Sequence, residues 1–149
     1  MTLYFAYGSN MSRTWMRELC PKAEALGPAV LADHRFLVMS RGYASVLPHL
    51  GDVVHGVLWR IAQVDLHALD RYEDVAGGLY DRWMIPVQHR GDRRTALIYV
   101  GRSHMPGHAR PEYCELVLSA ARDWELPAAY VANLARELSA RDSEAGELA

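Results

Sequence analysis

Short segments with strand character follow one another through the first two-thirds of the chain, and no other feature limits the possible folds as strongly. Their apolar and aromatic runs are bounded by Gly, Pro, Asn and Asp, a pattern typical of strands joined by turns. The predicted strands are Leu3–Tyr7, Ala23–Leu31, Arg35–Ser40, Ala44–Leu47, Val53–Arg60, Tyr80–Gln88 and Arg94–Val100. Short helices are expected after Ser12 and near Val64, and Arg90-Gly91-Asp92 predicts the hairpin turn between the last two strands.

A helical period replaces the strand pattern after Pro111. One apolar stripe is formed by Tyr113, Leu116, Val117, Ala120 and Trp124. A second helix is expected to begin near Pro127, because proline is accepted in the first turn of a helix. Strands followed by helices favour an α+β fold. We interpret residues 1–140 as one domain and residues 141–149 as a loose polar tail.

Composition indicates one small cytoplasmic protein. The chain has 149 residues, of which 50% are apolar, and this is enough for a single core. Sixteen Lys and Arg against eighteen Asp and Glu are scattered along it, so no nucleic-acid partner is expected. Neither a signal-peptide core nor an apolar run of about 18 residues occurs, so we expect no membrane association. Two distant cysteines suit reduced thiols, and the chain is expected to be a monomer or a homodimer.

The tetrapeptide Tyr7-Gly8-Ser9-Asn10 directly follows the apolar run Leu3-Tyr4-Phe5-Ala6. A glycine at the end of a strand lets the backbone come close to a ligand, and such a loop can present N–H groups to an anion. Gly, Ser and Asn also suit ordinary tight turns. From these residues alone the loop is either a ligand-binding loop or a plain turn.

Glu73 stands at the end of an amphipathic stretch. In a helix over Val64–Tyr72, Glu73 lies four residues after Leu69, so its carboxylate points along the apolar stripe. Desolvation would raise its pKa, which is how a general acid or base is made near neutral pH. A carboxylate merely solvated at the helix end is the alternative. The neighbours expected to face water are Asp65, Asp70 and Arg71.

These two segments together resemble the gamma-glutamylcyclotransferase-like family, which has an N-terminal strand leading into YGSN and a glutamate in an LD..E....Y context. Here the second motif is Leu69-Asp70, Glu73 and Tyr80. The strand Val54-His55-Gly56-Val57-Leu58-Trp59 matches a further family motif. Additional matches near the C-terminal end are Pro111, Tyr113, Leu126-Pro127 and Tyr130. Two departures are Asp74, where the family commonly has Gly, and a short segment from Arg41 to Ser45.

The resemblance implies a small mixed β-barrel or curled sheet of about six or seven strands, flanked by helices. It implies that the loop from Tyr7 to Asn10 and Glu73 lie on opposite walls of one cavity, with Tyr80 and Tyr113 as candidate lining residues. The residues that would bind the substrate are Tyr7, Gly8, Ser9, Asn10, Tyr80 and Tyr113. Tyr80 and Tyr113 are equally compatible with an ordinary core role.

The implied reaction is an intramolecular aminolysis of a gamma-glutamyl compound that releases 5-oxoproline, with Glu73 as general acid and base and with no cofactor or metal. The substrate would be a gamma-glutamyl amino acid, a gamma-glutamyl amine such as a modified lysine, or a biosynthetic compound that carries a gamma-glutamyl protecting group. The alternative is a non-catalytic member of the fold that binds a small ligand or a protein through the same cavity.

Three rival sites are weaker. Ser9 lacks the G-x-S-x-G turn of a serine nucleophile, and no histidine is placed beside it by a motif. His104 and His108 are separated by Pro106-Gly107, which argues against a helix that would aim both at one metal. The two cysteines, Cys20 and Cys114, occur in no CxxC setting, so structural thiols are expected.

Overall fold

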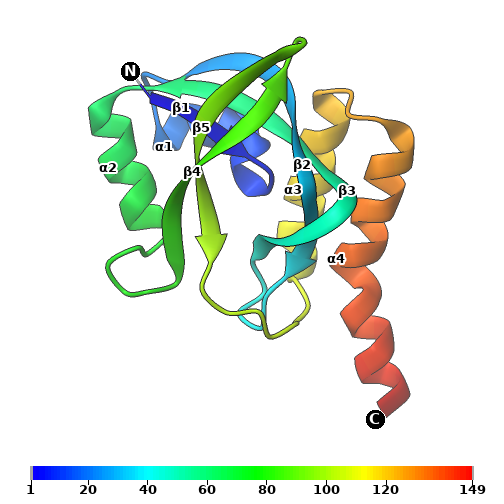
Figure 1. Cartoon of the computed structure of the whole chain (residues 1–149). Helices are drawn as coiled ribbons and strands as arrows, with labels where there is room; N and C mark the ends of the chain where they lie inside the picture. Colours follow the sequence, from blue (N-terminus) through cyan, green and yellow to red (C-terminus); the bar gives the residue numbers. More distant parts are fainter. Residues whose placement is uncertain (1, 149) are drawn as a thin grey trace.

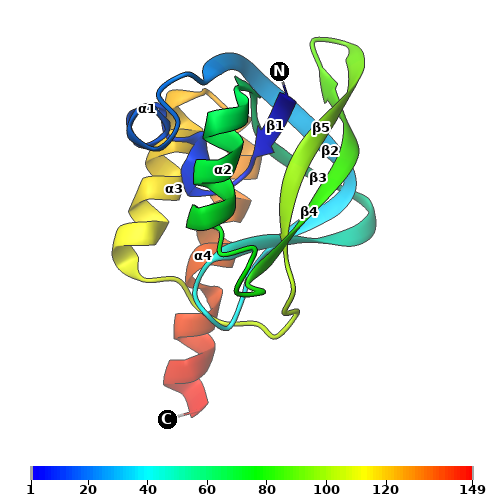
Figure 2. The same cartoon turned by 90° about the vertical axis from the view of Figure 1, so that its left-hand side faces the viewer.

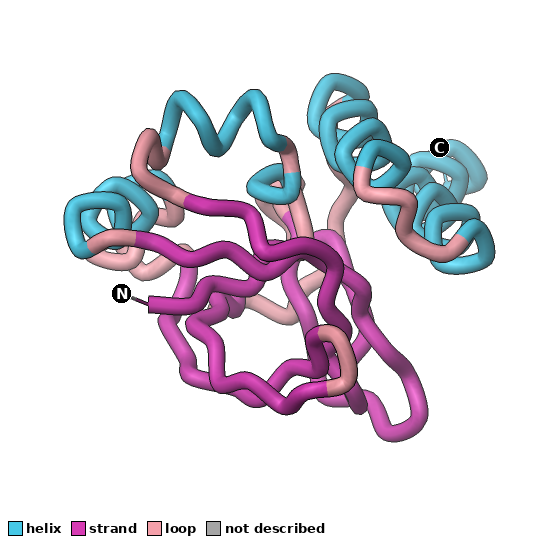
Figure 3. Tube along the Cα trace, turned by 90° about the horizontal axis from the view of Figure 1, so that it is seen from above, coloured by secondary structure: helices cyan, strands magenta, loops and turns pink. Residues whose placement is uncertain are grey.

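Five strands close into a small barrel in the computed structural model of the chain, which describes residues 2–148 and the side chains of residues 2–139. The strands are β1 Thr2–Ala6, β2 Glu24–Val38, β3 Ala44–Ile61, β4 Tyr80–His89 and β5 Asp92–Gly101. Their order around the barrel is β1-β3-β2-β4-β5, and Figure 3 shows the resulting ring of strands from above. Neighbouring strands are antiparallel except β1 and β5, which pair in parallel at Tyr4 and Leu97.

The prediction of six or seven strands was wrong because two breaks expected from the sequence lie within continuous strands. Ala23–Leu31 and Arg35–Ser40 belong largely to β2, and Ala44–Leu47 and Val53–Arg60 to β3. The pairing of β2 with β3 shifts register at Asp33, where φ is 58°. The Asp33 carboxylate also accepts a hydrogen bond from the Gly51 N–H at 3.0 Å. The residues around Asp33, which resemble a turn in the sequence, thus form a β-bulge within β2.

The helices lie on one side of the ring of strands in Figures 2 and 3. They are the 3₁₀ turn η1 Ser9–Met11 and the helices α1 Arg13–Leu19, α2 Gln63–Tyr72, α3 Pro111–Asp123 and α4 Ala128–Leu148. Figure 1 shows α2 to the left of the barrel with α3 and α4 to its right. Each expected helix is present, so the predicted α+β barrel flanked by helices is confirmed. Helix α4 runs across the division proposed at residue 140, and that division stays a prediction. No helix among residues 2–148 is long and apolar enough to span a membrane.

The hairpin between β4 and β5 turns at the predicted place. Arg90 and Gly91 both have positive φ, 51° and 84°, as a two-residue type I′ turn requires. The strands therefore follow each other without a long loop, and β5 returns beside β1 to close the barrel.

Strand β1 is the element that leads from the core into the predicted loop. Phe5 is fully buried and pairs with Leu58 of β3. Gly56 lets the two strands approach, because a Cβ atom there would contact the carbonyl of Ala6 and lie 2.7 Å from Cζ of Phe5. The glycine of the strand motif is thus required for the close contact between β3 and the end of β1.

We expect Gly56→Ala to lower the free energy of unfolding by about 2 kcal/mol or more, because an added methyl group overpacks the β1–β3 contact. Urea denaturation measures this. The control is Gly51→Asn, since Gly51 has φ of 89°, nothing lies within 4 Å of an added Cβ, and Asn tolerates this φ better than most residues. The control should lose less than about 1 kcal/mol. Equal losses in the two variants would contradict the role given to Gly56.

Candidate active site

One cavity of about 200 Å³ lies where the loop after β1, the end of α2 and the start of β3 meet. Every residue proposed for the site from the sequence lines this cavity: Tyr7, Gly8, Ser9, Asn10, Glu73, Tyr80 and Tyr113. Seven of the chain's eight tyrosines contribute to its wall. The barrel therefore gathers into one place residues that are far apart in the sequence, while their contact with a substrate stays a prediction.

Glu73 caps the C-terminus of α2. Its backbone N–H donates to the carbonyl of Leu69 at 2.8 Å, and Leu69 is fully buried, so the helix end is held against the core. The Glu73 side chain is partly buried and lines the cavity. Burial raises the pKa of its carboxyl from 4.5 to about 7, and the hydrogen bond from Asn10 opposes this rise. The carboxylate is thus tuned to exchange a proton near neutral pH.

Asp74, which follows the glutamate, departs from the family pattern but keeps the backbone conformation that favours glycine. Its φ is 51°. Asp tolerates this left-handed conformation better than most residues, and its carboxylate accepts the Gly77 N–H at 3.1 Å. The side chain is exposed and does not line the cavity.

Asn10 joins the loop to Glu73 directly. Its Nδ2 donates to Oε1 of Glu73 at 3.2 Å and to the hydroxyl of Tyr4 at 2.9 Å. Its Oδ1 accepts the indole N–H of Trp15 at 3.0 Å. The loop and Glu73 are therefore adjacent, and the expectation that they lie on opposite walls was wrong. The Asn10 amide is occupied by protein partners, so its backbone is the part left to meet a ligand.

Three further tyrosines fix the opposite part of the wall through backbone groups. Tyr80 donates to the carbonyl of Ala44, and Tyr113 accepts the N–H of Ala44 at 3.2 Å. Tyr7 donates to the carbonyl of Tyr99 at 2.6 Å. These hydroxyls hold the start of β3 and the loop after β1 in place, so Tyr80 and Tyr113 are both structural and cavity-lining.

Gly8 and Ser9 lie close to other residues of the cavity wall. A Cβ atom on Gly8 would lie 3.0 Å from the Tyr113 hydroxyl and 3.3 Å from Cβ of Ala44, so a larger residue would fill the cavity wall. The Ser9 hydroxyl lies 3.4 Å from that of Tyr72. Because the first N–H groups of a helical turn have no partner within it, the turn at Ser9 and Asn10 has backbone donors available.

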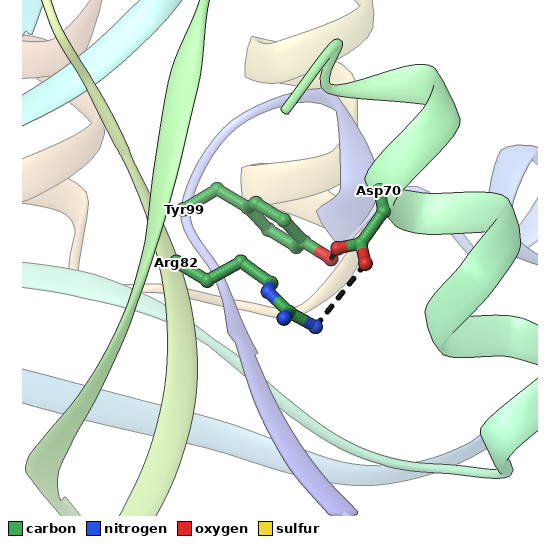
Figure 4. Close-up of polar contacts among 3 residues, drawn as sticks. All are labelled: Asp70, Arg82 and Tyr99. Atoms are coloured by element: carbon green, nitrogen blue, oxygen red, sulfur yellow. Dashed lines mark hydrogen bonds and ion pairs between the residues drawn. The ribbon is translucent and has the colours of Figure 1, made fainter. Parts of the chain in front are cut away.

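Of the three neighbours expected to face water, Arg71 is exposed, Asp70 is half-buried and Asp65 is buried. Asp70 accepts the Tyr99 hydroxyl at 2.7 Å and the Arg82 guanidinium at 3.1 Å, and Figure 4 shows both side chains directed at it. Asp65 is buried and accepts the Ala62 N–H at the start of the helix. Asp70 therefore ties α2 to β4 and β5, which holds the end that carries Glu73 beside the barrel.

Sequence reasoning missed half of the cavity wall. The further lining residues are Tyr4, Arg41, Tyr43, Ala44, Tyr72, Leu79 and Tyr99. Tyr4 and Tyr72 stand beside the two motifs in the sequence. Aromatic residues next to both motifs could have indicated that these two tyrosines line the same cavity. Arg41 and Tyr43 come from the segment noted as short, between β2 and β3. Only the barrel topology brings that segment to the site.

The rival sites gain no support. Ser9 has a tyrosine rather than a histidine beside its hydroxyl, and no histidine or cysteine lines the cavity among the described residues. The described residues contain no group of three or more His, Cys, Asp or Glu side chains placed to hold a metal. Burial raises the pKa of Cys20 to about 12, and Asp65 adds to this, so its thiol stays protonated.

Comparisons with known proteins agree with this architecture. The gamma-glutamylcyclotransferases of Homo sapiens and Mus musculus are 27% and 30% identical to this chain in alignments of 139 residues, which cover 86% of this chain and 74% of each relative. A solved structure of a gamma-glutamyl cyclotransferase superposes with a TM-score of 0.83 at 27% identity, covering 89% of this chain and 85% of that one. The model of one family, described as gamma-glutamyl cyclotransferase, AIG2-like, matches residues 4–126. The chain therefore belongs to the AIG2-like gamma-glutamyl cyclotransferase family.

Proposed function

We propose that the protein is a gamma-glutamyl cyclotransferase, which converts a gamma-glutamyl compound into 5-oxoproline and a free amine or amino acid. The observation that carries this proposal is the Glu73 carboxylate, which lines the cavity beside the loop from Tyr7 to Asn10 with its pKa raised to about 7 by burial. Family membership supports the same reaction, since the human and mouse relatives bear the name of this activity.

The reaction is an intramolecular aminolysis. Glu73 takes a proton from the α-ammonium group of the substrate, and the freed α-amino nitrogen attacks the γ-carbonyl carbon. A carbon–nitrogen bond closes the five-membered ring, the γ-amide bond breaks, and the leaving nitrogen receives the proton back from Glu73. Atoms balance without water, so substrate equals the sum of 5-oxoproline and amine.

The rest of the cavity would hold the folded substrate. Ring closure is favoured when the amine and the carbonyl are already in contact, with effective molarities on the order of 10⁵ M or more. The backbone N–H groups of Gly8, Ser9 and Asn10 are suited to bind the α-carboxylate or the oxyanion that develops on the γ-carbonyl. The tyrosine rings would pack against the aliphatic part of the glutamyl unit.

A panel of three substrate classes tests the proposal. Gamma-glutamyl amino acids, gamma-glutamyl amines and compounds whose amino group carries a gamma-glutamyl protecting group are incubated with the protein, and 5-oxoproline is measured by mass spectrometry. We expect release from at least one class. Binding of these compounds without any release would instead favour the non-catalytic member of the fold.

We predict that Glu73→Gln lowers kcat by about 10²-fold or more, the range typical of general acid–base groups, while fold and substrate binding persist. Gln has the same size and can still accept the hydrogen bond from Asn10, but it cannot carry a proton. Asp74→Asn is the matched control, because it neutralises the adjacent carboxylate and Asn can still accept the Gly77 N–H. More than a third of wild-type activity in Glu73→Gln would exclude Glu73 as the proton carrier.

The pH dependence of kcat/KM should show an acidic limb set by Glu73. Its pKa of about 7 means that the carboxyl is protonated below that pH and cannot accept a proton. The rate constant should therefore fall about tenfold per pH unit below pH 7 and climb again at high pH as the substrate amine deprotonates. Stopped assays across the range measure this, with a chelator present in a parallel series. An acidic limb that persists in Glu73→Gln would show that another group accepts the proton of the substrate amine.

We expect Gly8→Val to abolish substrate binding in a protein that still folds, because the branched side chain would crowd Tyr113 and Ala44 and fill this part of the cavity. Calorimetry in a Glu73→Gln background measures affinity without turnover. Gly91→Asn serves as the control, since it changes a glycine of the distant β4–β5 turn with nothing within 4 Å of an added Cβ. Wild-type affinity in a folded Gly8→Val protein would show that the loop is only a turn.

A further inference from the structure

The side-chain amide of Asn10 has neighbours of opposite hydrogen-bonding character at its two ends. The indole nitrogen of Trp15 lies 3.0 Å from its oxygen, and a carboxylate oxygen of Glu73 lies 3.2 Å from its nitrogen. An indole N–H only donates and an ionised carboxylate only accepts, so each contact alone requires the same orientation of the amide. The Tyr4 hydroxyl can donate or accept and therefore does not select an orientation.

Trp15 is held independently of Asn10. It lies in the first turn of α1, where its backbone N–H donates to the side chain of the helix cap Ser12 at 3.2 Å. Its ring packs against that of Tyr72, with centroids 5.3 Å apart. Both the backbone and the ring of Trp15 are thus fixed, so its N–H is a rigid donor aimed at Asn10.

This arrangement matters because the two protonation states of Glu73 prefer opposite orientations of the amide. Ionised Glu73 can only accept a hydrogen bond, and the amide N–H of Asn10 donates it. A protonated Glu73 carboxyl could instead donate to the amide oxygen if the amide turned over. Turning the amide over would set its NH₂ group against the Trp15 N–H and leave donors buried without an acceptor. Trp15 therefore blocks the orientation that would favour the protonated carboxyl.

We propose that Trp15 is a positioning residue, whose indole N–H fixes the Asn10 amide so that a hydrogen-bond donor always faces the Glu73 carboxylate. Its significance for catalysis rests on the proposed function, but the positioning itself does not. Asn10 then acts on Glu73 through its side chain, beside any contact that its backbone makes with a substrate.

The other titratable groups around Glu73 do not obscure its titration. Six tyrosines interact with its charge, from β1, the loop after β1, α2, β4, β5 and α3: Tyr4, Tyr7, Tyr72, Tyr80, Tyr99 and Tyr113. Burial is the main cause that raises the pKa of each of them, so all six stay neutral near pH 7. The remaining charged side chain in the cavity wall is Arg41.

The decisive variant is Trp15→Phe, which removes the N–H and keeps an aromatic ring against Tyr72. Carbon-13 NMR of labelled glutamate carboxyls follows the titration of Glu73, with Glu73→Gln used for assignment. We expect the midpoint to move upward by roughly one pH unit, because the freed amide can now stabilise the protonated carboxyl. The acidic limb of kcat/KM should move by the same amount.

Trp124→Phe is the matched control. It removes an indole N–H that donates to the Met11 carbonyl at 2.7 Å, next to Asn10 in the chain but not on its amide. We expect the titration of Glu73 to be unchanged. If Trp15→Phe does not fold, benzothienylalanine at position 15 gives the same test, because it has the shape of tryptophan and lacks the N–H.

The background Asn10→Ala separates positioning from general packing. Without the amide, Trp15→Phe should have no further effect on the titration of Glu73. Equal shifts in both backgrounds, or no shift in Trp15→Phe alone, would overturn the proposal. A wild-type protein that releases no 5-oxoproline would refute the proposed function instead, while the NMR titration would still decide the role of Trp15.

Discussion

The hydrogen bond from Asn10 to Glu73 joins segments 63 residues apart, and the rest of the site is arranged around it. The donor, Asn10, lies in η1, which begins shortly after the end of β1. Gly56 of β3 allows the end of β1 to pack closely at that point. The acceptor, Glu73, is available because buried Leu69 and the Asp70 contacts hold the end of α2 beside the barrel. The barrel serves this contact by holding two short segments in a fixed relation.

This contact partly offsets an unfavourable burial. The folded protein raises the Glu73 pKa from 4.5 to about 7, so it binds a proton that the unfolded chain releases between these values. By linkage, Glu73 makes the fold less stable as the pH rises through that window, by on the order of 3 kcal/mol when complete. A buried carboxylate that destabilises the fold is typical of functional sites, where a group with a shifted pKa is retained although it lowers stability.

How much of this was visible in the sequence depended on the kind of signal. The loop residues from Tyr7 to Asn10 and Glu73 stand in ordered local motifs, so their positions could be predicted. The break near Asp33 could not, because Asp followed by polar residues looks the same in a turn and in a bulge. The contact of Trp15 with Asn10 was missed, because it depends on the directions of the two side chains. Asp70 was expected to face water, because its partner Tyr99 is brought near only when the barrel closes.

The tyrosines explain why so small a cavity can control one carboxylate. The hydroxyls of Tyr7, Tyr80 and Tyr113 are engaged with backbone groups of the wall itself, so the rings are rigid and present largely apolar faces. Among the described residues lining the cavity, Glu73 and Arg41 are the only acidic or basic side chains. In such weakly solvated surroundings a single hydrogen bond to the carboxylate has a larger effect than it would in water. The orientation of one amide can therefore decide whether Glu73 is ionised at the pH where it has to accept a proton.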